Sequence, residues 1–379
     1  MSTKPIRSSR PFFPPEDISL ILQDIRLALE EGRLRNGKNL SAFEKLFADY
    51  LKIENAVAFD SDSSAFETIL HYFGVKDREV IVCTNSFISV PNSVLYSGAK
   101  VVFADIREDT LSIDVQSVKN KISDKTCGVI VTHIAGFPNP DLKEIIRLCK
   151  DNDLFLIEDA THAVGATVEG QKAGTFGDAA VFAFTPTKIL TTGEGAMLVS
   201  NDNKLAEEAK RFSYYGSGTG KTNFVNLGRH MMLSEISAIM GLYQLKRVEE
   251  FITWRNEIAA IYNKVIDKSI KMHRVRCTEG CRCSYYKYPL ILDESVDTKQ
   301  FTQILMDQFG VETGNVFYPP CHLQTVYKKL SAQNRMDTLP VAEKVLSQTI
   351  TLPMHAALSK DEAKYVMNSC LYTLEQLSK

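Results

Sequence analysis

The chain has 379 residues, of which 44% are hydrophobic and 24% are charged, and its formal net charge is −2 at pH 7. Because there is no excess of basic residues to neutralise phosphates, the composition argues against a nucleic-acid-binding protein. No stretch is apolar for long enough to span a bilayer, and residues 1–15 lack the apolar core of a secretion signal. We therefore expect a cytoplasmic protein with neither a nucleic-acid nor a membrane partner.

Short apolar runs alternate with helical patterns between residues 56 and 200. Seven of these runs are predicted strands: 56–59, 79–83, 100–104, 128–132, 155–158, 179–184 and 196–200. Several are rich in β-branched residues and do not alternate with polar ones, which is typical of strands buried on both faces of a largely parallel sheet. Helical patterns between the strands, such as 141–151, indicate an α/β domain with helices on both sides.

The pattern changes after residue 234. A long helical stretch at 234–265 is expected to link two lobes, since a chain of this length favours more than one. It is followed by a predicted strand at 285–292 and by predicted helices at 298–309 and 360–377. This order predicts a smaller α+β lobe. We place the large domain at residues 1–250, with the N-terminal segment included, and the small domain at 251–379.

The eight cysteines are not expected to form a disulfide framework. Five lie in apolar patterns and are expected to pack as small hydrophobic groups: Cys83, Cys127, Cys149, Cys321 and Cys370. Cys277, Cys281 and Cys283 form a cluster that would suit zinc, with His273 as a conceivable fourth ligand. A structural zinc site normally takes ligands in two pairs, and the second pair is missing. We therefore expect exposed thiols beside a strand and no metal.

An acidic and a basic residue follow predicted strands of the same sheet. Asp159 comes directly after the strand 155–158, and Lys188 follows the strand 179–184. Ligands of open α/β sheets collect at the carboxyl ends of strands. Pyridoxal phosphate needs this pair, because a lysine forms the Schiff base and a carboxylate keeps the pyridine nitrogen protonated. The spacing alone also suits a structural aspartate and a solvated lysine.

Longer segments of the chain resemble the DegT/DnrJ/EryC1/StrS family of sugar aminotransferases. The resemblance runs from about residue 11 to the end of the chain and rests on these segments: 11–15, 158–165, 184–188, 192–195, 233–235, 318–324 and 352–355. It implies the α/β fold of fold-type-I pyridoxal-phosphate transferases. In that fold a large domain with a mostly parallel seven-stranded sheet is followed by a smaller C-terminal α+β domain.

The resemblance implies roles for residues around the cofactor. Lys188 matches the lysine that forms the internal aldimine and moves the proton between substrate and cofactor, and Asp159 matches the partner of the pyridinium nitrogen. His162 matches a position near the phenolic oxygen, and Phe87 matches the aromatic residue that stacks on the pyridine ring. The alternatives are a buried structural histidine at His162 and a core aromatic residue at Phe87.

The phosphate of the cofactor is expected at the polar turn 60–64, before a helical segment at 65–73. A helix start offers free N–H groups to an anion. Ser63 and Ser64 are the expected ligands, although capping of the helix would also explain these serines.

The chain departs from the family pattern at three phosphate positions. Asp62 stands where the pattern has a glycine, and Ala183 stands where it has a serine. His230 stands where it has an asparagine that reaches the cofactor from the neighbouring subunit. Asp62 either turns away as a helix cap or places a carboxylate near the phosphate. We expect a functional enzyme with altered, weaker retention of the cofactor.

The resemblance also implies the substrates and the assembly. Glutamate is the expected amino donor, a nucleotide-linked keto hexose is the expected acceptor, and a homodimer is expected to share its active sites. Arg35 is expected to meet the nucleotide diphosphate, with a solvated helix end as the alternative, and Tyr318 and His322 are further expected substrate residues. Two alternatives stay open: an aminotransferase for a cyclitol or aminobenzoate precursor, and a regulatory homologue that binds the cofactor without turnover. Lys188 argues against a related dehydratase branch, which has histidine there.

Residues 215–222 look like a nucleotide-binding P-loop, but two features argue against it. Tyr215 stands where the motif requires glycine, and a predicted helix at 203–212, rather than a strand, precedes the segment. We expect a mobile loop. Lys221 is expected to be solvated, with contact to a substrate phosphate as the alternative.

Overall fold

The computed structural model describes residues 5–218, 222–331 and 338–378. In this part of the chain a seven-stranded sheet has the order β1-β9-β8-β5-β4-β2-β3. Its strands are β1 (Asn55–Phe59), β2 (Glu79–Cys83), β3 (Lys100–Ala104), β4 (Thr126–Thr132), β5 (Phe155–Asp159), β8 (Ala179–Ala183) and β9 (Ala196–Ser200). Strand β9 pairs antiparallel with β1 and β8, and the remaining pairs are parallel. The predicted α/β fold with a mostly parallel seven-stranded sheet is confirmed.

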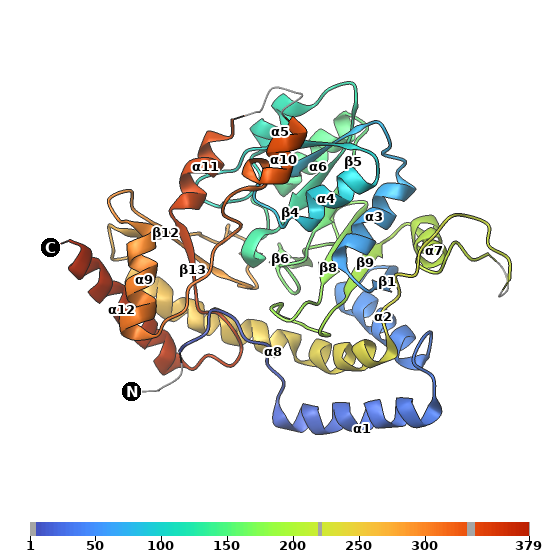
Figure 1. Ribbon diagram of the computed structural model, residues 1–379, viewed down its shortest axis with the longest axis horizontal. Helices are drawn as coiled ribbons and strands as arrows, with labels where there is room; N and C mark the ends of the chain where they lie inside the picture. The colour runs from blue at the N-terminus through green and yellow to red at the C-terminus, as the bar shows by residue number, and fades with distance from the viewer. Residues whose placement is uncertain (1–4, 219–221, 332–337, 379) are drawn as a thin grey trace.

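Helices cover both faces of this sheet, as Figure 1 shows. They are α2 (Lys38–Leu51), α3 (Asp62–Tyr72), α4 (Ser89–Tyr96), α5 (Val115–Lys121), α6 (Leu142–Asp151), α7 (Asn203–Phe212) and α8 (Glu235–Ile266). Because side chains alternate along a strand, Ile130 packs towards α3, α4 and α7, whereas its neighbours Val129 and Val131 pack towards α6 and α8. Burial of each such side chain stabilises the fold by about 1.5–3 kcal/mol.

The C-terminal part has its own sheet, in the order β10-β12-β13. Its elements are β10 (Met272–Arg274), β12 (Tyr288–Leu292), α9 (Thr298–Phe309), η2 (Cys321–Leu323), α10 (Thr325–Ser331), α11 (Pro340–Ser347), β13 (Thr349–Leu352) and α12 (Lys360–Leu377). The predicted strand 285–292 was too long, because β12 begins only at Tyr288. Tyr285 has a left-handed backbone with φ 48°. The amide of Lys287 donates to the carbonyl of Ala135 and not to a carbonyl of a neighbouring strand. Residues 284–287 therefore form a turn that contacts the short helical segment 134–136, which follows β4.

The two predicted domains share helix α8. The boundary placed between residues 250 and 251 falls inside this helix, which continues to Ile266 and packs against both parts of the chain. The N-terminal segment also crosses over: Ile6 pairs with Val311, and the carbonyl of Ser8 accepts from the amide of Met354 at 3.1 Å. Helix α1 (Pro15–Glu31) lies alongside α8 on the outside of the molecule (Figure 1).

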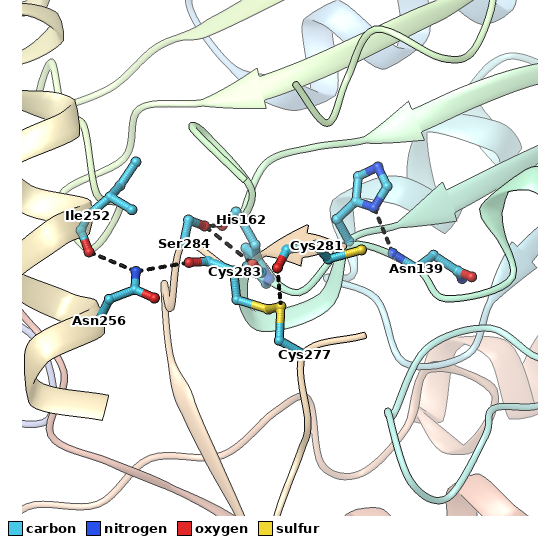
Figure 2. The surroundings of a disulfide bond; sticks show 10 residues. Asn139, His162, Ile252, Asn256, Cys277, Cys281, Cys283 and Ser284 are labelled. Carbon is cyan, nitrogen blue, oxygen red and sulfur yellow. Dashed lines mark hydrogen bonds between the residues drawn. A yellow bond between two sulfur atoms is a disulfide. The ribbon is translucent and has the colours of Figure 1, made fainter. Parts of the chain in front are cut away.

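The cysteine cluster was predicted incorrectly. Cys277 and Cys283 form a disulfide, shown in Figure 2, and Cys283 is only 2% exposed. The pairing arises because β11 (Cys281–Arg282) joins the hairpin of β6 (Thr167–Val168) and β7 (Gln171–Lys172). This contact folds residues 277–283 into a tight loop. Cys281 keeps a free thiol.

Within the described residues, no group of three His, Cys, Asp or Glu side chains is placed to hold a metal ion. Four of the five remaining cysteines are buried, as expected, and Cys127 is partly buried. Among the described helices, none combines the length and apolar character needed to cross a membrane.

Candidate active site

A cavity of about 410 Å³ lies at the carboxyl ends of β2, β5 and β8. Five residues predicted from the sequence line it: Asp62, Phe87, His162, Ala183 and Lys188. Ten lining residues were missed: Ser8, Ser9, Thr185, Thr187, Tyr286, Lys287, Gly314, Phe317, Thr351 and Leu352. Most of the missed residues come from the N-terminal segment and from the C-terminal part, which together cover the end of the sheet. We call these residues the covering side of the cavity and the residues at the strand ends its sheet side.

Lys188 sits in a closed loop after β8. Its amide donates to the carbonyl of Thr185 at 3.0 Å, and the amide of Thr192 donates to the carbonyl of Phe184 at 3.0 Å, which closes the loop. Gly195 completes this loop at φ 146°, where a Cβ atom would lie 2.6 Å from the side chain of Leu233. The loop therefore requires glycine there. It directs the ammonium of Lys188 into the cavity, 4.7 Å from the centre of the Tyr286 ring.

Asp159 ends β5 and is buried next to the cavity. Its two oxygens accept one hydrogen bond each, from the hydroxyl of Thr132 at 3.0 Å and from the amide of Thr161 at 3.1 Å. Burial raises the pKa of this carboxyl, while the contacts with Thr161 and the charge of Lys188 oppose that shift. Among the described residues, no cationic side chain lies within ion-pair distance of Asp159. Its oxygens can accept further donors.

His162 is a neutral donor on the cavity wall. Its Nδ1 accepts from the amide of Ala135 at 3.2 Å, which places the ring proton on Nε2. Burial and the charges of Lys188 and Lys287 hold the pKa of His162 well below its ordinary value. The ring packs against Tyr286, with centroids 4.3 Å apart. Ser284 donates to the carbonyl of His162 at 3.3 Å, and Figure 2 shows this pair near the disulfide.

Phe87 is not a core residue. Its ring is 50% exposed, lines the cavity, and lies 5.7 Å from the ring of Phe317 on the covering side. An aromatic face left open at the end of a buried strand is available for stacking.

The polar turn before α3 differs from the prediction in its capping residue. Ser61 caps the helix by accepting from the amide of Ser64 at 3.2 Å, so the helix begins at Asp62 rather than at residue 65. Asp62 therefore does not turn away as a cap. It lines the cavity and accepts from the hydroxyl of Ser89 at 2.8 Å. The structure does not bring the side chains of Ser63 and Ser64 into the lining.

Ala183 lines the cavity at the last position of β8, without a hydroxyl. Thr185 lies two residues further along and also lines the cavity. This threonine offers a hydroxyl on the same side of the site, because side chains two positions apart in an extended chain share a face.

The remaining predicted residues lie outside the cavity lining. Arg35 and His230 are exposed and contact each other, with 3.3 Å between Nη1 and Nε2. Tyr318 is 47% exposed next to Phe317. His322 is buried, with 2.6 Å between its Nδ1 and the hydroxyl of Thr84 and 3.3 Å between its Nε2 and Glu343. The structure thus brings together the residues of the sheet end, but not these four. Lys221 lies outside the described residues.

Two acidic residues of the matched segments have structural roles. Glu235 accepts from the amides of Gly37, Asn39 and Leu40 at 2.7–3.2 Å, so it caps the start of α2. The buried Glu158 accepts from His133 at 2.8 Å and from the amides of residues 174, 176 and 177.

Comparisons with known proteins identify the family of this chain. A model of the DegT/DnrJ/EryC1/StrS aminotransferase family matches residues 15–371. The spore coat polysaccharide biosynthesis protein SpsC of Bacillus subtilis is 30% identical, covering 95% of this chain and 97% of that protein. The GDP-perosamine synthase of Vibrio cholerae is 30% identical, covering 88% of this chain and 90% of that protein. The structure of PseC from Helicobacter pylori, an aminotransferase of pseudoaminic acid biosynthesis, superposes with a TM-score of 0.91 at 27% identity, covering 98% of this chain and all of that one. This chain therefore belongs to the DegT/DnrJ/EryC1/StrS aminotransferase family.

Proposed function

We propose that this enzyme transfers the amino group of glutamate to a nucleotide-linked keto sugar, with pyridoxal 5'-phosphate as cofactor and Lys188 as the residue that holds it. The observation that carries the proposal is the cavity that collects Lys188, His162 and Phe87 beside the buried Asp159. The names of similar proteins, a GDP-perosamine synthase and a UDP-linked amino sugar transaminase of Campylobacter jejuni, support a nucleotide sugar as acceptor.

The residues of the cavity fit this cofactor. Asp159 is a buried carboxylate with room for a further donor, which suits a protonated pyridine nitrogen. The open face of Phe87 suits stacking on the ring, and the Nε2 proton of His162 suits the phenolic oxygen. The start of α3 and the hydroxyl of Thr185 are the expected phosphate contacts. When bound, pyridoxal phosphate supplies an electron sink and carries the amino group between the two substrates.

The residues of this chain bind, orient and move protons. Lys188 would hold the cofactor through its Nζ and, once the donor amine has freed it, would serve as the base that accepts and returns a proton beside the reacting carbon. Burial would raise the pKa of Tyr286, but the charges of Lys188 and Lys287 and a hydrogen bond with Thr187 bring it below its ordinary value. The ring of Tyr286 lies beside the ammonium of Lys188, and its hydroxyl is 3.0 Å from the hydroxyl of Thr187.

We further propose a homodimer in which Arg35 and His230 reach the cavity of the partner. Both side chains are exposed and neither lines the cavity of its own protomer. Helix α1 leaves Leu22 and Leu29 exposed on its outer side, at 61% and 55%. An apolar helix face of this kind suits burial against a second copy.

Three measurements on the purified protein test the proposed function. Borohydride reduction in the presence of the cofactor should attach its mass to the peptide that contains Lys188. Addition of glutamate should then release 2-oxoglutarate, and a panel of nucleotide-linked keto sugars should identify the acceptor. A protein that binds the cofactor at Lys188 but releases no 2-oxoglutarate would support the regulatory alternative. Amination of a cyclitol in preference to every keto sugar would support the other alternative.

A further inference from the structure

The covering side of the cavity contributes a second lysine, Lys287. It belongs to the turn that precedes β12, where its amide donates to the carbonyl of Ala135 at 3.2 Å. Its side chain enters the cavity lining, and its ammonium donates to the carbonyl of Asn315 at 2.7 Å. The ammonium also lies 5.8 Å from the ring centre of Tyr286 and 5.5 Å from that of Phe317. Lys287 is thus held by backbone and aromatic contacts.

The charge of Lys287 has no anionic partner. Among the described residues, no carboxylate lies within ion-pair distance of its ammonium. Asp62 lines the same cavity, but its carboxylate accepts from the hydroxyl of Ser89 instead. Burial and the neighbouring charge of Lys188 lower the pKa of Lys287. An ammonium has three donors, and the single carbonyl partner leaves two of them without an acceptor. A cation placed this way is stabilised when an anion enters the cavity.

The turn that carries Lys287 is fixed by a buried arginine. Arg255 on α8 donates through Nη1 to the carbonyls of Tyr285 at 3.0 Å, Tyr286 at 3.2 Å and Met354 at 2.9 Å. Three carbonyls from two segments are thereby held at one guanidinium nitrogen. The backbone of the turn is tied to a long helix, which is the condition for a binding residue that does not have to be ordered when a ligand arrives.

We propose that Lys287 binds a carboxylate of the amino donor, and of the oxo acid that remains after transfer. This inference rests on the proposed function. The ammonium groups of Lys188 and Lys287 lie 4.7 Å and 5.8 Å from the centre of the same tyrosine ring. The α-carboxylate of an amino acid is one carbon away from its amine, so a cation close to the reacting nitrogen suits it. In a nucleotide sugar the sugar ring separates the keto carbon from the diphosphate, so the diphosphate would lie further out.

The test compares Lys287→Met and Lys287→Arg with the wild-type protein. Lys143→Met is the matched control, since Lys143 is an exposed lysine of α6 that pairs with Glu169 far from the lining. The first readout is the dissociation constant of 2-oxoglutarate and of succinate, measured calorimetrically with the cofactor-loaded protein. Lys287→Met should weaken both by ~10- to 100-fold, as expected for loss of a charge-assisted hydrogen bond, and Lys287→Arg should restore part of the affinity.

The second readout separates donor from acceptor. The rate of the first half-reaction with glutamate should fall in Lys287→Met, whereas the much slower rate with propylamine, which has no carboxylate, should stay unchanged. The rate of the second half-reaction with the keto sugar should also stay unchanged. Equal affinity of the wild-type protein and Lys287→Met for 2-oxoglutarate would overturn the inference. So would a selective loss of affinity for the nucleotide sugar, because that result would assign Lys287 to the diphosphate.

Failure of the proposed function has a different outcome. It would appear as absence of cofactor mass at Lys188 after borohydride reduction, or as absence of 2-oxoglutarate release by the wild-type protein. The calorimetric titration with succinate involves no turnover and, repeated with the cofactor-free protein, still measures the role of Lys287 in that case. Borohydride labelling of Lys188 in Lys287→Met establishes that this variant is folded and loaded. A wild-type protein that binds no dicarboxylate at any soluble concentration would also overturn the inference.

Discussion

The two sides of the cavity hold their side chains by different means. On the sheet side, Asp159 ends one strand and Lys188 follows another, and the register of both strands is set by neighbouring strands while their side chains are buried on both faces. On the covering side, Lys287 and Phe317 come from turns that contain left-handed residues, with φ 48° at Tyr285 and 55° at Phe317. The sheet side is therefore suited to chemistry in which the reacting side chains must not be displaced. The covering side is suited to the selection of substrates.

The largest expected effect is on the sheet side. Lys188→Ala should leave the protein folded, because the side chain is only partly buried, and should reduce amino transfer by at least ~10⁴-fold. Turnover with glutamate and mass labelling by borohydride measure this effect. Retained turnover would contradict the central role of Lys188.

The second prediction for the sheet side concerns Asp159→Asn. This variant should have a lower turnover rate, and its cofactor-free form should be more stable than the wild-type protein. Without a charge opposite the pyridine nitrogen, turnover should fall by ~10²- to 10⁴-fold. In the cofactor-free protein, burial raises the pKa of Asp159, so ionisation of this group destabilises the fold as the pH rises through its raised pKa. The variant should therefore gain stability relative to wild type between acidic and neutral pH.

Thermal melts of both cofactor-free proteins over that pH range measure the difference. A gap that shrinks towards neutral pH would contradict the assignment. Loading with the cofactor should reverse the order, because the protonated pyridine nitrogen then compensates the carboxylate.

Asp62→Asn tests the departure at the phosphate position. Removal of a carboxylate that lines the cavity should tighten cofactor binding by ~5- to 20-fold. Asp60→Asn is the matched control, because Asp60 belongs to the same turn but is exposed and does not line the cavity. Cofactor retained after dialysis measures both variants. Equal retention in the two would show that Asp62 does not face the phosphate.

The smallest effect is expected at His322. Its ring is buried between Thr84 and Glu343 and does not line the cavity. His322→Gln should change the kcat/KM for the keto sugar by less than about threefold, while lowering thermal stability through the lost hydrogen bonds, worth about 1–3 kcal/mol. A selective rise in the KM for the sugar would restore the substrate role that the sequence suggested.

The sheet side could be predicted because its information is local. Apolar runs mark the strands, and the residue after each run lies at the carboxyl end of the sheet, so Asp159 and Lys188 could be placed from pattern and spacing. Phe87 and His162 required the resemblance, since an aromatic or a histidine after a strand has many structural uses. The predicted roles of these four residues stay predictions.

The covering side could not be predicted, because its information is non-local. Tyr285 adopts a left-handed backbone without being glycine or asparagine, so the continuous apolar run at 285–292 looked like one strand. Ser8 enters the site because Ile6 pairs with Val311, which is more than 300 residues away. Ser61 and Asp62 are both good capping residues, and the sequence does not decide between them. If the sequence had marked residues 284–287 as a turn, Tyr286 and Lys287 could have been predicted as residues of the site.

The continuity of α8 has a consequence for how substrates enter. Hinge closure of two domains needs a connection of a few residues that absorbs a change in φ and ψ. Here a helix of 32 residues passes from one part of the chain to the other. Its Arg255 also donates hydrogen bonds to the carbonyls of Tyr285 and Met354 on the covering side of the cavity. Wide opening would require breaking this helix. We therefore expect the cavity to admit its ligands through movement of the facing side chains of Phe87 and Phe317, without rotation of one half of the molecule against the other.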